Sequence, residues 1–394
     1  MEVSVAREAV IVEAVRTPVG RRNGGLNGWH PVDLLGEILN ELVARSGVDA
    51  TTVDDVICGC VSQVGEQSLN IGRNAWLAAG LPEEVPATTV DRQCGSSQQA
   101  VHFAAQGVIA GAYDVAVACG VEHMSRVPMG SSAQSQGWPF TERLMSRYEG
   151  GLVPQGISAE IIAERWDLSR GELDEFGARS HERAGAATAS GAFKDEIHPV
   201  KVETDDGTDL FDTDEGIRIP NLEKMATLVP AFKPDGVVTA ANSSQISDGA
   251  AALLITTPER ADEMGLTARA RLVSFALAGT DPVSMLTGPI PATKKALDRA
   301  GLDLRDIDLV EINEAFASVV LAWKKELGLE DDWFDERVNV HGGAIALGHP
   351  LGASGARLMT TLLHTLEQRE GRYGLQTMCE GGGLANATII ERVA

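Results

Sequence analysis

The sequence is poor in cysteine and in long apolar runs, and each shortage excludes a class of protein. Five cysteines in 394 residues are too few for a disulfide framework, and an odd number favours a reducing compartment. No segment approaches the roughly 20 apolar residues that a membrane-spanning helix needs. Residues 1–14 lack the long apolar core and cleavage site of a secretion signal. These shortages predict a soluble cytoplasmic protein.

Basic residues are also scarce, because 33 lysines and arginines face 56 acidic residues and leave a net charge of −23. Nucleic acids and anionic membranes are therefore excluded as general partners, since phosphate binding needs clustered basic side chains. An anionic ligand would need a local basic pocket. The 44% of hydrophobic residues and the 42 glycines indicate a compact chain with many tight turns. Its length predicts two or three domains.

One α/β pattern occurs twice, at a great distance along the chain. In each copy a helical stretch is followed by a glycine, an aspartate two residues later and then a short apolar strand. The copies comprise residues 34–57 and 292–311. The spacing therefore predicts a duplicated α/β unit.

The second parts of the two copies also correspond. Residues 95–110 are rich in small side chains and predict a buried helix that leads to a strand over 114–119. Residues 352–366 predict a helix that leads to a strand over 375–379. Cys119 and Cys379 are thus expected at the ends of matching strands, where open α/β sheets place ligands.

The region between the two halves differs in composition, with charged helices and scattered prolines. Ser169 and Glu172 have capping-box spacing and predict a helix that extends through Ala184. The acidic run over 203–215 lacks the oxygen-ligand spacing of a calcium site, so we expect a solvated loop and no metal. The predicted parts are an N-terminal half (1–121, completed by 240–268), an inserted loop domain (122–239) and a C-terminal half (269–394).

Four short motifs carry chemically capable side chains among glycines and other small residues. They are Gln93-Cys94-Gly95-Ser96, Asn313-Glu314-Ala315-Phe316, Gly348-His349-Pro350 and Cys379-Glu380-Gly381-Gly382-Gly383. Together they offer a nucleophile, its base, a second acid or base and an anchor for an oxyanion. This combination predicts thiol-based acyl transfer.

These motifs, in this order, make the chain resemble the thiolases, which make or break a carbon–carbon bond next to a CoA thioester. The resemblance spans nearly the whole chain, from residues 11–18 through 242–244 and 248–251 to Cys379. It implies a duplicated α-β-α-β-α five-layer fold of the α/β class, with an inserted loop domain. It also implies CoA as a substrate, no tightly bound cofactor, and a homodimer or homotetramer.

The resemblance assigns a role to each motif. It implies that Cys94 is the nucleophile that becomes acylated, and the start of a helix at this position predicts a lowered thiol pKa. His349 would activate Cys94 and donate to the thioester oxygen, with Asn313 holding a water that completes this oxyanion hole. Cys379 would exchange the proton at the α-carbon of acetyl-CoA. The amides of Cys94 and Gly381 would form a second oxyanion hole.

For CoA, the resemblance points to Ser244 near the pantetheine and to Arg218 near the adenine. Two positions depart from the family pattern. Residues 154–156 read Pro-Gln-Gly where many short-chain thiolases have His-Met-Gly, so the floor of the acyl pocket is expected to differ. His341 stands in place of a commoner asparagine, with either a structural role or a supporting role near His349.

The predicted function is that of a 3-ketoacyl-CoA thiolase, an acetyl-CoA C-acyltransferase. Residues 311–321 and 388–393 are most similar to bacterial thiolases that degrade bulky or steroid-derived acyl-CoA, which favours degradation. Acetoacetyl-CoA synthesis by an acetyl-CoA C-acetyltransferase is an alternative.

Three other kinds of protein are less compatible with the motifs. A decarboxylating ketosynthase would pair its cysteine with two histidines and lacks a motif like that at Cys379. A non-catalytic acyl-CoA or lipid-binding relative would not need all four chemical positions. A nicotinamide-binding protein would need a glycine fingerprint after the first strand, which residues 11–20 lack.

Overall fold

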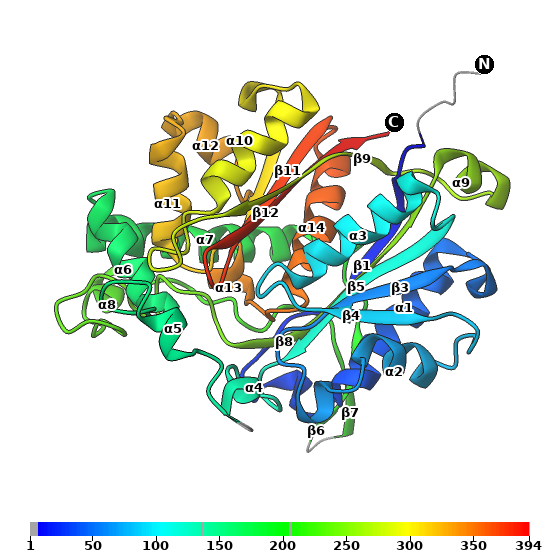
Figure 1. Ribbon diagram of the computed structural model, residues 1–394, viewed down its shortest axis with the longest axis horizontal. Coiled ribbons are helices and arrows are strands. Elements are labelled where there is room, and N and C mark those ends of the chain that lie inside the picture. Colours follow the sequence, from blue (N-terminus) through cyan, green and yellow to red (C-terminus); the bar gives the residue numbers. More distant parts are fainter. Residues whose placement is uncertain (1–6, 135–136, 205–206, 394) are drawn as a thin grey trace.

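The computed structural model describes residues 7–134, 137–204 and 207–393. Its core is a large mixed sheet made of two similar parts (Figure 1). The N-terminal part has the order β4 (Ala87–Val90), β3 (Asp55–Gly59), β5 (Val115–His123), β8 (Ser247–Thr256) and β1 (Val10–Arg16). The C-terminal part has the order β10 (Leu309–Ile312), β11 (Tyr373–Glu380), β12 (Leu384–Arg392) and β9 (Ala270–Gly279). A short strand, β2 (Gly20–Arg21), pairs with β8.

The two parts of the sheet repeat one topology, which confirms the predicted duplication. In the N-terminal part β3 pairs with β5 in parallel, and in the C-terminal part β10 pairs with β11 in parallel. Each pair continues into an antiparallel strand, β8 next to β5 and β12 next to β11. The two parts join where Val10 and Ile11 of β1 pair with Arg271 and Ala270 of β9.

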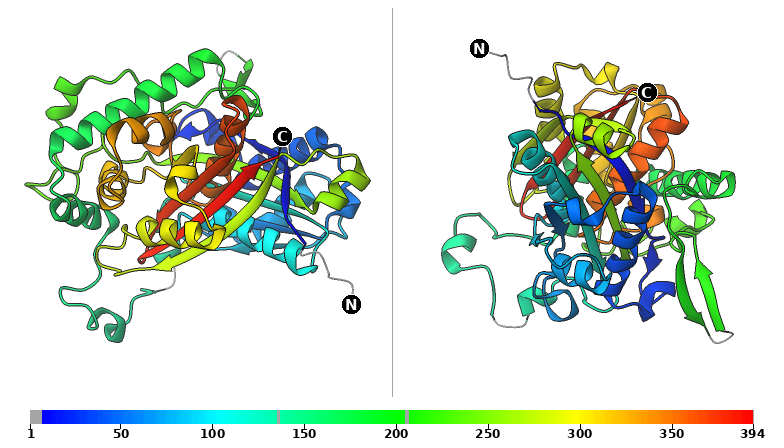
Figure 2. Two further views of the ribbon diagram at one scale, coloured as in Figure 1. Left: turned by 90° about the horizontal axis from the view of Figure 1, so that it is seen from above. Right: turned by 90° about the vertical axis from the view of Figure 1, so that its right-hand side faces the viewer.

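Helices and sheet alternate in five layers (Figures 1 and 2). The central layer holds α3 (Ser96–Ala110) and α14 (Ser354–Gln368), which pack on each other and on both parts of the sheet. The outer face of the N-terminal part is covered by α1 (Pro31–Ser46) and α2 (Ile71–Ala78). The outer face of the C-terminal part is covered by α10 (Pro289–Ala300). The short helix α9 (Pro258–Met264) follows β8.

Alternation along β5 shows why the layers form. Val115, Val117 and Cys119 belong to the apolar core shared with α1 and α2, whereas Ala116 and Ala118 belong to the core shared with α3 and α14. Successive strand side chains point to opposite faces, so one strand serves both cores. The small alanines let the central helices lie close to the sheet.

Close approach of the two central helices also depends on glycine. A Cβ at position 355 in α14 would lie 2.2 Å from the amide nitrogen of Gln98 in α3. Only glycine therefore fits at this contact. The contact fixes the start of α14 against the start of α3.

Two local predictions were wrong. Cys119 does not end its strand, because β5 continues through Gly120 to His123. Cys119 instead lies inside the sheet, where its backbone is in register with that of Cys58 in β3. The acidic run is not a plain loop, since β6 (Val200–Thr204) and β7 (Gly207–Phe211) form an antiparallel hairpin. Val200 is buried in the core of the N-terminal half, and Val202 and Phe211 pack against it, so the acidic strands are anchored from one side. Residues 205–206 of the run lie outside the described residues.

The inserted region carries most of the remaining helices, which lie towards the left in Figure 1. They are α4 (Ser131–Gln134), α5 (Glu142–Met145), α6 (Gln155–Arg165), α7 (Arg170–Ser190) and α8 (Leu222–Ala226). The predicted capping box is confirmed, because Ser169 and Glu172 exchange side-chain and backbone hydrogen bonds at the start of α7. The helix extends to Ser190, beyond the predicted end. The proposed domain limits stay a prediction, although β5 runs past the limit at residue 121.

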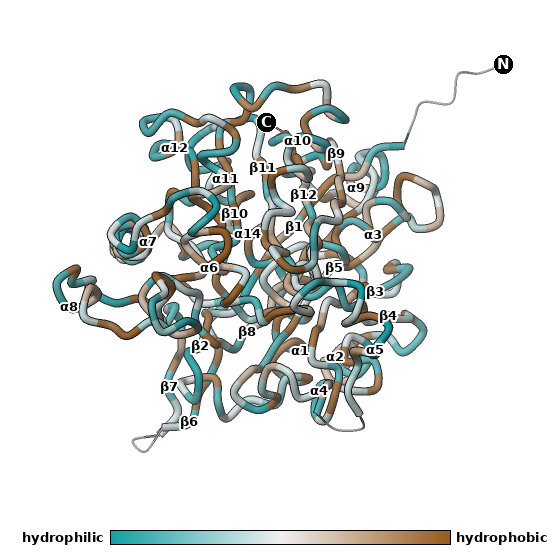
Figure 3. Tube along the Cα trace, turned by 60° about the vertical axis from the view of Figure 1, so that its left-hand side comes forward, coloured by the Kyte–Doolittle hydropathy of each residue, from teal (hydrophilic) through white to brown (hydrophobic). Residues whose placement is uncertain are grey.

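Figure 3 shows hydrophobic segments concentrated in the central strands and helices, while α8 and the β6–β7 hairpin extend outward. The C-terminal half is completed by α11 (Ala317–Glu326), α12 (Asp331–Arg337) and α13 (Ala344–Leu347). Trp323 and Phe334 from α11 and α12 are fully buried in the core that contains β10 to β12.

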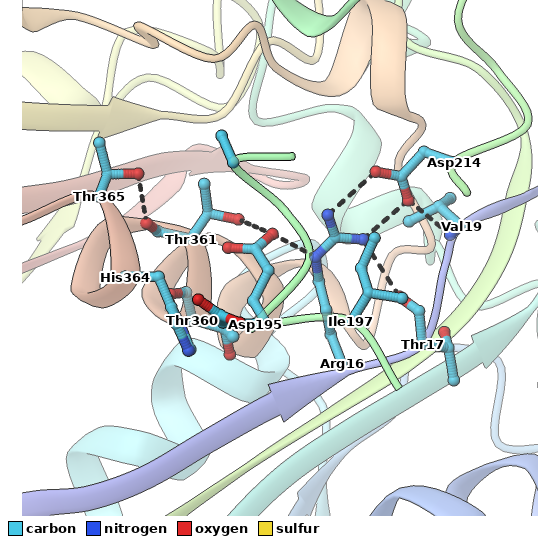
Figure 4. Close-up of polar contacts among 12 residues, drawn as sticks. Arg16, Thr17, Val19, Asp195, Ile197, Asp214, Thr360, Thr361, His364 and Thr365 are labelled. Carbon is cyan, nitrogen blue, oxygen red and sulfur yellow. Dashed lines mark hydrogen bonds and ion pairs between the residues drawn. The ribbon is translucent and has the colours of Figure 1, made fainter. Parts of the chain in front are cut away.

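A buried ion cluster joins the inserted region to the sheet (Figure 4). Arg16, the last residue of β1, donates from Nε to Glu196 at 2.6 Å and from both terminal nitrogens to Asp214 at 2.7 and 2.9 Å. The three side chains are at most 1% exposed. Thr361 of α14 also donates to Glu196 at 3.0 Å. Because the charges are desolvated, removing one partner leaves another uncompensated.

We expect Asp214→Ala to lower the free energy of unfolding by about 3–5 kcal/mol, because Arg16 would keep a buried charge without its bidentate partner. Urea denaturation measures the change. The control is Glu263→Ala, which removes an exposed partner of Arg260 and should cost less than about 1 kcal/mol. An equal decrease in the free energy of unfolding in the two variants would contradict the stabilising role of the buried ion cluster.

Candidate active site

Three of the predicted residues lie where neighbouring elements end. Cys379 is the second-last residue of β11, and Asn313 directly follows β10. The Asn313 amide donates to the carbonyl of Thr377 at 3.0 Å, which keeps the two strand ends together. Cys94 lies in the turn before α3, whose N-cap is Gly95. The carboxyl ends of parallel strands share one edge of the sheet, and this edge collects the cysteines and the asparagine.

His349 follows α13 through a glycine that has no substitute. Gly348 has φ +106°, and a Cβ there would lie 2.4 Å from the Oγ of Ser247. The His349 amide donates to the Ser247 hydroxyl at 3.2 Å. The residue is 4% exposed. Backbone conformation and burial therefore hold the imidazole in one place.

Hydrogen bonds define which nitrogen of His349 carries the proton. The Ser354 hydroxyl donates to the carbonyl of Pro350 at 2.8 Å, so it accepts from Nδ1–H of His349 at 2.6 Å. Nε2 then carries no proton, and its lone pair accepts from the side-chain amide of Asn313 at 3.3 Å. This network leaves Nε2 as the ring nitrogen that takes up a proton.

Burial keeps His349 neutral. It lowers the pKa of the imidazole to about 3, and the nearby positive charge of Arg357 lowers it further in the same direction. A neutral imidazole can act as a base throughout the physiological pH range. Arg357 lies on α14, three residues after Ser354. This one helix therefore supplies both the hydrogen-bond partner of His349 and the positive charge that lowers its pKa.

The predicted lowering of the Cys94 pKa is wrong for the unliganded site. Burial raises the pKa of Cys94 to about 12, and the charge of Glu380 adds to the increase. Contacts with the Gln155 side chain and with the amide of Gly381 act in the opposite direction but are weaker. The start of α3 does lie at Cys94 as expected, yet desolvation outweighs its amide dipoles. Cys94 is therefore a thiol at rest and needs a base.

Cys379 is also a thiol at rest. Its pKa is raised well above the ordinary value, first by burial and then by the charges of Cys94 and Glu380. The influence of the Cys94 charge on the pKa of Cys379 places the two sulfur atoms in one electrostatic environment. Two thiols in such a site cannot both be ionised at low cost, which favours one negative charge at a time.

An apolar cluster joins the motifs around Cys94. Its buried members are Cys94, Met124, Leu351 and Met378. Leu351 lies two residues after His349, and Met378 directly precedes Cys379. The cluster brings the cysteine motifs and the histidine segment to one place. No hydrogen bond between described residues joins Cys94 directly to His349.

Gly381 lies beside residues from two other segments. A Cβ at this position would be 3.1 Å from Oε1 of Gln93 and 3.4 Å from Nε2 of Gln155. Gln155 begins α6 and belongs to the Pro-Gln-Gly segment that departs from the family pattern. The structure therefore places Gln155, which departs from the family pattern, next to both Cys94 and Gly381.

A cavity of about 590 Å³ lies next to the apolar cluster around Cys94 and is lined by both residues expected to contact CoA. Arg218 and Ser244 line it, and the amide of Ser244 donates to the carbonyl of Ala315 at 3.0 Å. Its basic lining residues are Arg21, Arg22, Arg218 and Lys224. The cavity thus supplies the local basic pocket that an anionic ligand would need in an acidic protein.

The cavity reaches the histidine and cysteine motifs through two further lining residues. Gln245 accepts the amide of His349 through its carbonyl at 3.3 Å. Ile246 packs against the apolar cluster that contains Cys94. The wall of the cavity therefore adjoins both the His349 segment and the apolar cluster of Cys94.

No hydrogen bond or ring contact between described residues joins His341 to His349. The His341 ring packs edge-on against Phe193, with ring centroids 5.8 Å apart. Its Nε2 is buried without a hydrogen-bonding partner among the described residues, and burial lowers the pKa of the ring. These contacts favour the structural role over direct support of His349.

Sequence reasoning missed several residues that shape the site. Ser354 fixes the His349 tautomer, and its spacing after the histidine was the only available signal. Glu314 accepts from the Ser180 hydroxyl at 2.6 Å, from the Asn339 amide at 2.9 Å and from the Ile345 amide at 3.2 Å. It therefore anchors the loop that carries Asn313. No pattern in one sequence could reveal these long-range partners.

Within the described residues there is no helix long and apolar enough to cross a membrane, and no group of three or more side chains suited to a metal ion. The chain matches the family model for the thiolase N-terminal domain over residues 9–259 and that for the thiolase C-terminal domain over residues 266–392. The matches divide the chain between β8 and β9, where its two halves meet.

Similar proteins cover almost the whole chain. It is 52% identical to steroid 3-ketoacyl-CoA thiolase FadA6 of Mycobacterium tuberculosis, over 99% of this chain and 95% of the relative. It is 48% identical to a 3-ketoacyl-CoA thiolase of Citrobacter koseri, over 98% and 99%. The solved structure of the Bacillus anthracis acetyl-CoA acetyltransferase has a TM-score of 0.90 at 39% identity, over 98% of this chain and 99% of that chain.

We expect the His349 imidazole to stay neutral as the pH falls from about 8 to about 5, because its pKa lies near 3 in the buried site. Nitrogen NMR of labelled histidine follows the titration, and the His349→Asn variant identifies the resonance. The spectrum should report the tautomer with the proton on Nδ1. An inflection near the ordinary histidine value of about 6.5 would contradict the proposed electrostatics.

Proposed function

This chain belongs to the thiolase family and is an acetyl-CoA C-acyltransferase, and we propose that it cleaves 3-ketoacyl-CoA with CoA through an acyl group on Cys94. The observation that supports this most is the grouping of two buried thiols around a glycine-rich turn, in one site with a neutral imidazole whose Nε2 carries no proton. A site with one thiol would suffice for acyl transfer alone. The second thiol can protonate the carbanion that carbon–carbon cleavage produces.

In the first half-reaction, His349 takes the proton of Cys94 at Nε2, and the thiolate attacks the 3-keto carbon of the substrate. The bond between that carbon and the α-carbon breaks and leaves the acyl group on Cys94. The electron pair of the broken bond moves into the enolate of acetyl-CoA. Cys379 protonates this enolate and becomes the thiolate. The negative charge thus moves from one sulfur to the other.

In the second half-reaction, the thiol of free CoA gives up its proton within the site and attacks the acyl-cysteine. The shortened acyl-CoA leaves, and Cys94 is again the leaving thiolate, which His349–H⁺ can protonate. The Cys379 thiolate takes the proton of the incoming CoA. Both thiols are then restored. The same steps in reverse would join two acyl groups.

Two groups of donors would stabilise the oxyanions. His349 can donate from Nε2 once it is protonated, and the buried Oδ1 of Asn313 has no partner among the described residues, so it can hold a water there. The backbone amides of Cys94 and Gly381 would donate to the other reactive carbonyl, and contacts of both amides already favour the Cys94 thiolate, which supports this role. Preorganised donors in a buried site stabilise developing charge strongly.

CoA would bind in the basic cavity, with Ser244 near the pantetheine and Arg218 near the adenine. Arg21, Arg22 and Lys224 offer further positive charge to the phosphates of CoA. The contact between Gln245 and His349 supports this direction of entry, because the thioester end then points to the reactive thiols.

The physiological substrate we propose is larger than acetoacetyl-CoA. Gln155 lies next to Gly381, in the segment that replaces the histidine and methionine of many short-chain enzymes. The FadA6 relative is named for steroid substrates, which supports a bulky acyl group. A second candidate function is acetyl-CoA C-acetyltransferase activity, because the Bacillus anthracis neighbour carries that name and the same chemistry runs in both directions.

An oligomer and a cytoplasmic location complete the proposal. The edge strand β4 ends the sheet, and an edge with free backbone groups favours pairing with another chain. Leu69, Leu77 and Phe103 are exposed apolar side chains of the same half of the molecule. These features support a homodimer or homotetramer. All five cysteines are free, which supports a reducing compartment.

Replacing Cys379 should separate the acylation of Cys94 from proton exchange at the α-carbon. In Cys379→Ser we expect Cys94 still to accept an acetyl group from acetyl-CoA, while deuterium exchange at the acetyl methyl falls at least about a hundredfold, since the hydroxyl is a poor base. Mass spectrometry measures both. Cys119→Ala, which alters a buried thiol of the equivalent strand β5, is the control and should change neither. Loss of acetylation with exchange intact would reverse the two assignments.

The acyl pocket should prefer chains longer than acetoacetyl, because one methylene of fit is worth roughly 1–3 kcal/mol. Thiolysis rates for short, long and polycyclic 3-ketoacyl-CoA substrates test this. We expect kcat/KM to differ by orders of magnitude across the series and Gln155→Met to shift the preference towards short chains. An optimum at acetoacetyl-CoA would favour the second candidate function, and thiolysis of no substrate in the panel would refute both.

A further inference from the structure

Glu380 follows Cys379 at the end of β11 and is buried without a hydrogen-bonding partner. The residue is 0% exposed. Neither carboxyl oxygen has a partner among the described residues. Burial of an unpaired carboxylate is very costly, whereas a neutral acid costs far less. The burial of this ionisable side chain between two reactive motifs therefore calls for a physical explanation.

The Glu380 carboxyl lies against the segment that carries Cys94. A Cβ added to Gly95 would lie 2.0 Å from Oε1 of Glu380 and 2.6 Å from its Cδ. The side chain therefore occupies the space over the Cα of the residue that follows Cys94. Since Glu380 also follows Cys379 in sequence, one carboxyl lies next to both cysteine motifs.

The charged groups around Glu380 do not offset its burial. Burial raises its pKa well above the ordinary value. Arg92 and a backbone contact from Asn386 favour the charged form of the carboxyl, and Asp91 opposes it. The remaining titratable neighbours are Cys94 and Cys379, whose pKa values the Glu380 charge raises. Burial therefore favours the neutral form of the carboxyl.

We propose that Glu380 is a positioning residue that acts as a neutral acid: uncharged, it allows Cys94 and Cys379 to carry negative charge in turn, and ionised, it opposes both. This inference rests on the proposed function, in which the two sulfurs share one charge. Glu380 transfers no proton in it. Its packing on Gly95 holds the turn of Cys94 against the end of β11, and its ionisation limits activity at alkaline pH.

The sign of the effect follows from the two ionisations. Below the Glu380 pKa the acid is neutral and the thiols feel no added charge. Above it, the carboxylate makes loss of a thiol proton harder, so the Cys94 pKa rises further. Removing this charge while keeping the shape should therefore lower the Cys94 pKa.

The test is Glu380→Gln, which keeps the shape but cannot ionise. The rate of Cys94 alkylation by iodoacetamide, mapped by mass spectrometry between about pH 6 and about pH 10, reports the thiolate. At about pH 9 we expect the variant to react at least about threefold faster than the unmodified enzyme. Its kcat/KM for a 3-ketoacyl-CoA should stay within about threefold at neutral pH, and its alkaline limb should move to higher pH.

Glu311→Gln is the matched control. Glu311 lies on the adjacent strand β10, burial raises its pKa to about 8, and the groups that influence it are Arg357 and other charges, not the cysteines. It should leave the alkylation profile of Cys94 unchanged. If Glu380→Gln does not fold, Glu380→Leu tests the same charge removal with a side chain of similar size.

Two results would overturn the inference. One is an alkylation profile in the neutral variants that matches the unmodified enzyme. The other is a loss of more than about a hundredfold in turnover at neutral pH with faster alkylation, which would make Glu380 a proton-transfer residue. Alkylation needs no turnover, so if the unmodified enzyme itself has no thiolase activity while Glu380→Gln still shows faster alkylation, the proposed function is refuted and the electrostatic role of Glu380 is not.

Discussion

Removal of water from Cys94 and Cys379 is the constraint on which the rest of the site depends. Desolvation raises the pKa of both thiols and lowers that of His349, so every reactive group is neutral at rest. A neutral site tolerates burial, and it gains charge only when substrate brings its own carbonyl groups and a proton moves to Nε2. The hydrogen bond from His349 to Ser354 directs that proton.

The fold supplies this dry environment by bringing distant segments to one edge of the sheet. The ends of β10 and β11 carry Asn313 and Cys379, while α3 and α14 meet closely enough, at Gly355, to set Cys94 and Ser354 on the same side. The Arg16 cluster ties the inserted region to this framework. The inserted region then contributes Gln155 and Arg218 to the site. The ion cluster that stabilises the fold thus also holds the region that completes the site.

The sequence alone was enough to predict the repeated α/β units, both central helices and the motifs that meet at the site. These features depend on local periodicity, on caps and on small residues, as for the helix that begins after Ser169. Other features depend on distant partners. The β6–β7 hairpin is anchored by the packing of Val200, and the pKa of Cys94 is set by burial that no local pattern reveals. The roles of Ser354, Glu314 and Glu380 became visible only in three dimensions.

The central claim is that a neutral, buried His349 makes Cys94 the nucleophile. The most direct measurement is the time course of acyl transfer to the enzyme in a single turnover, followed by intact mass and peptide mapping. We expect one acyl adduct on the peptide that contains Cys94, none in Cys94→Ala, and formation at least about a hundredfold slower in His349→Ala. An adduct that persists in Cys94→Ala, or an unchanged rate in His349→Ala, would contradict the account.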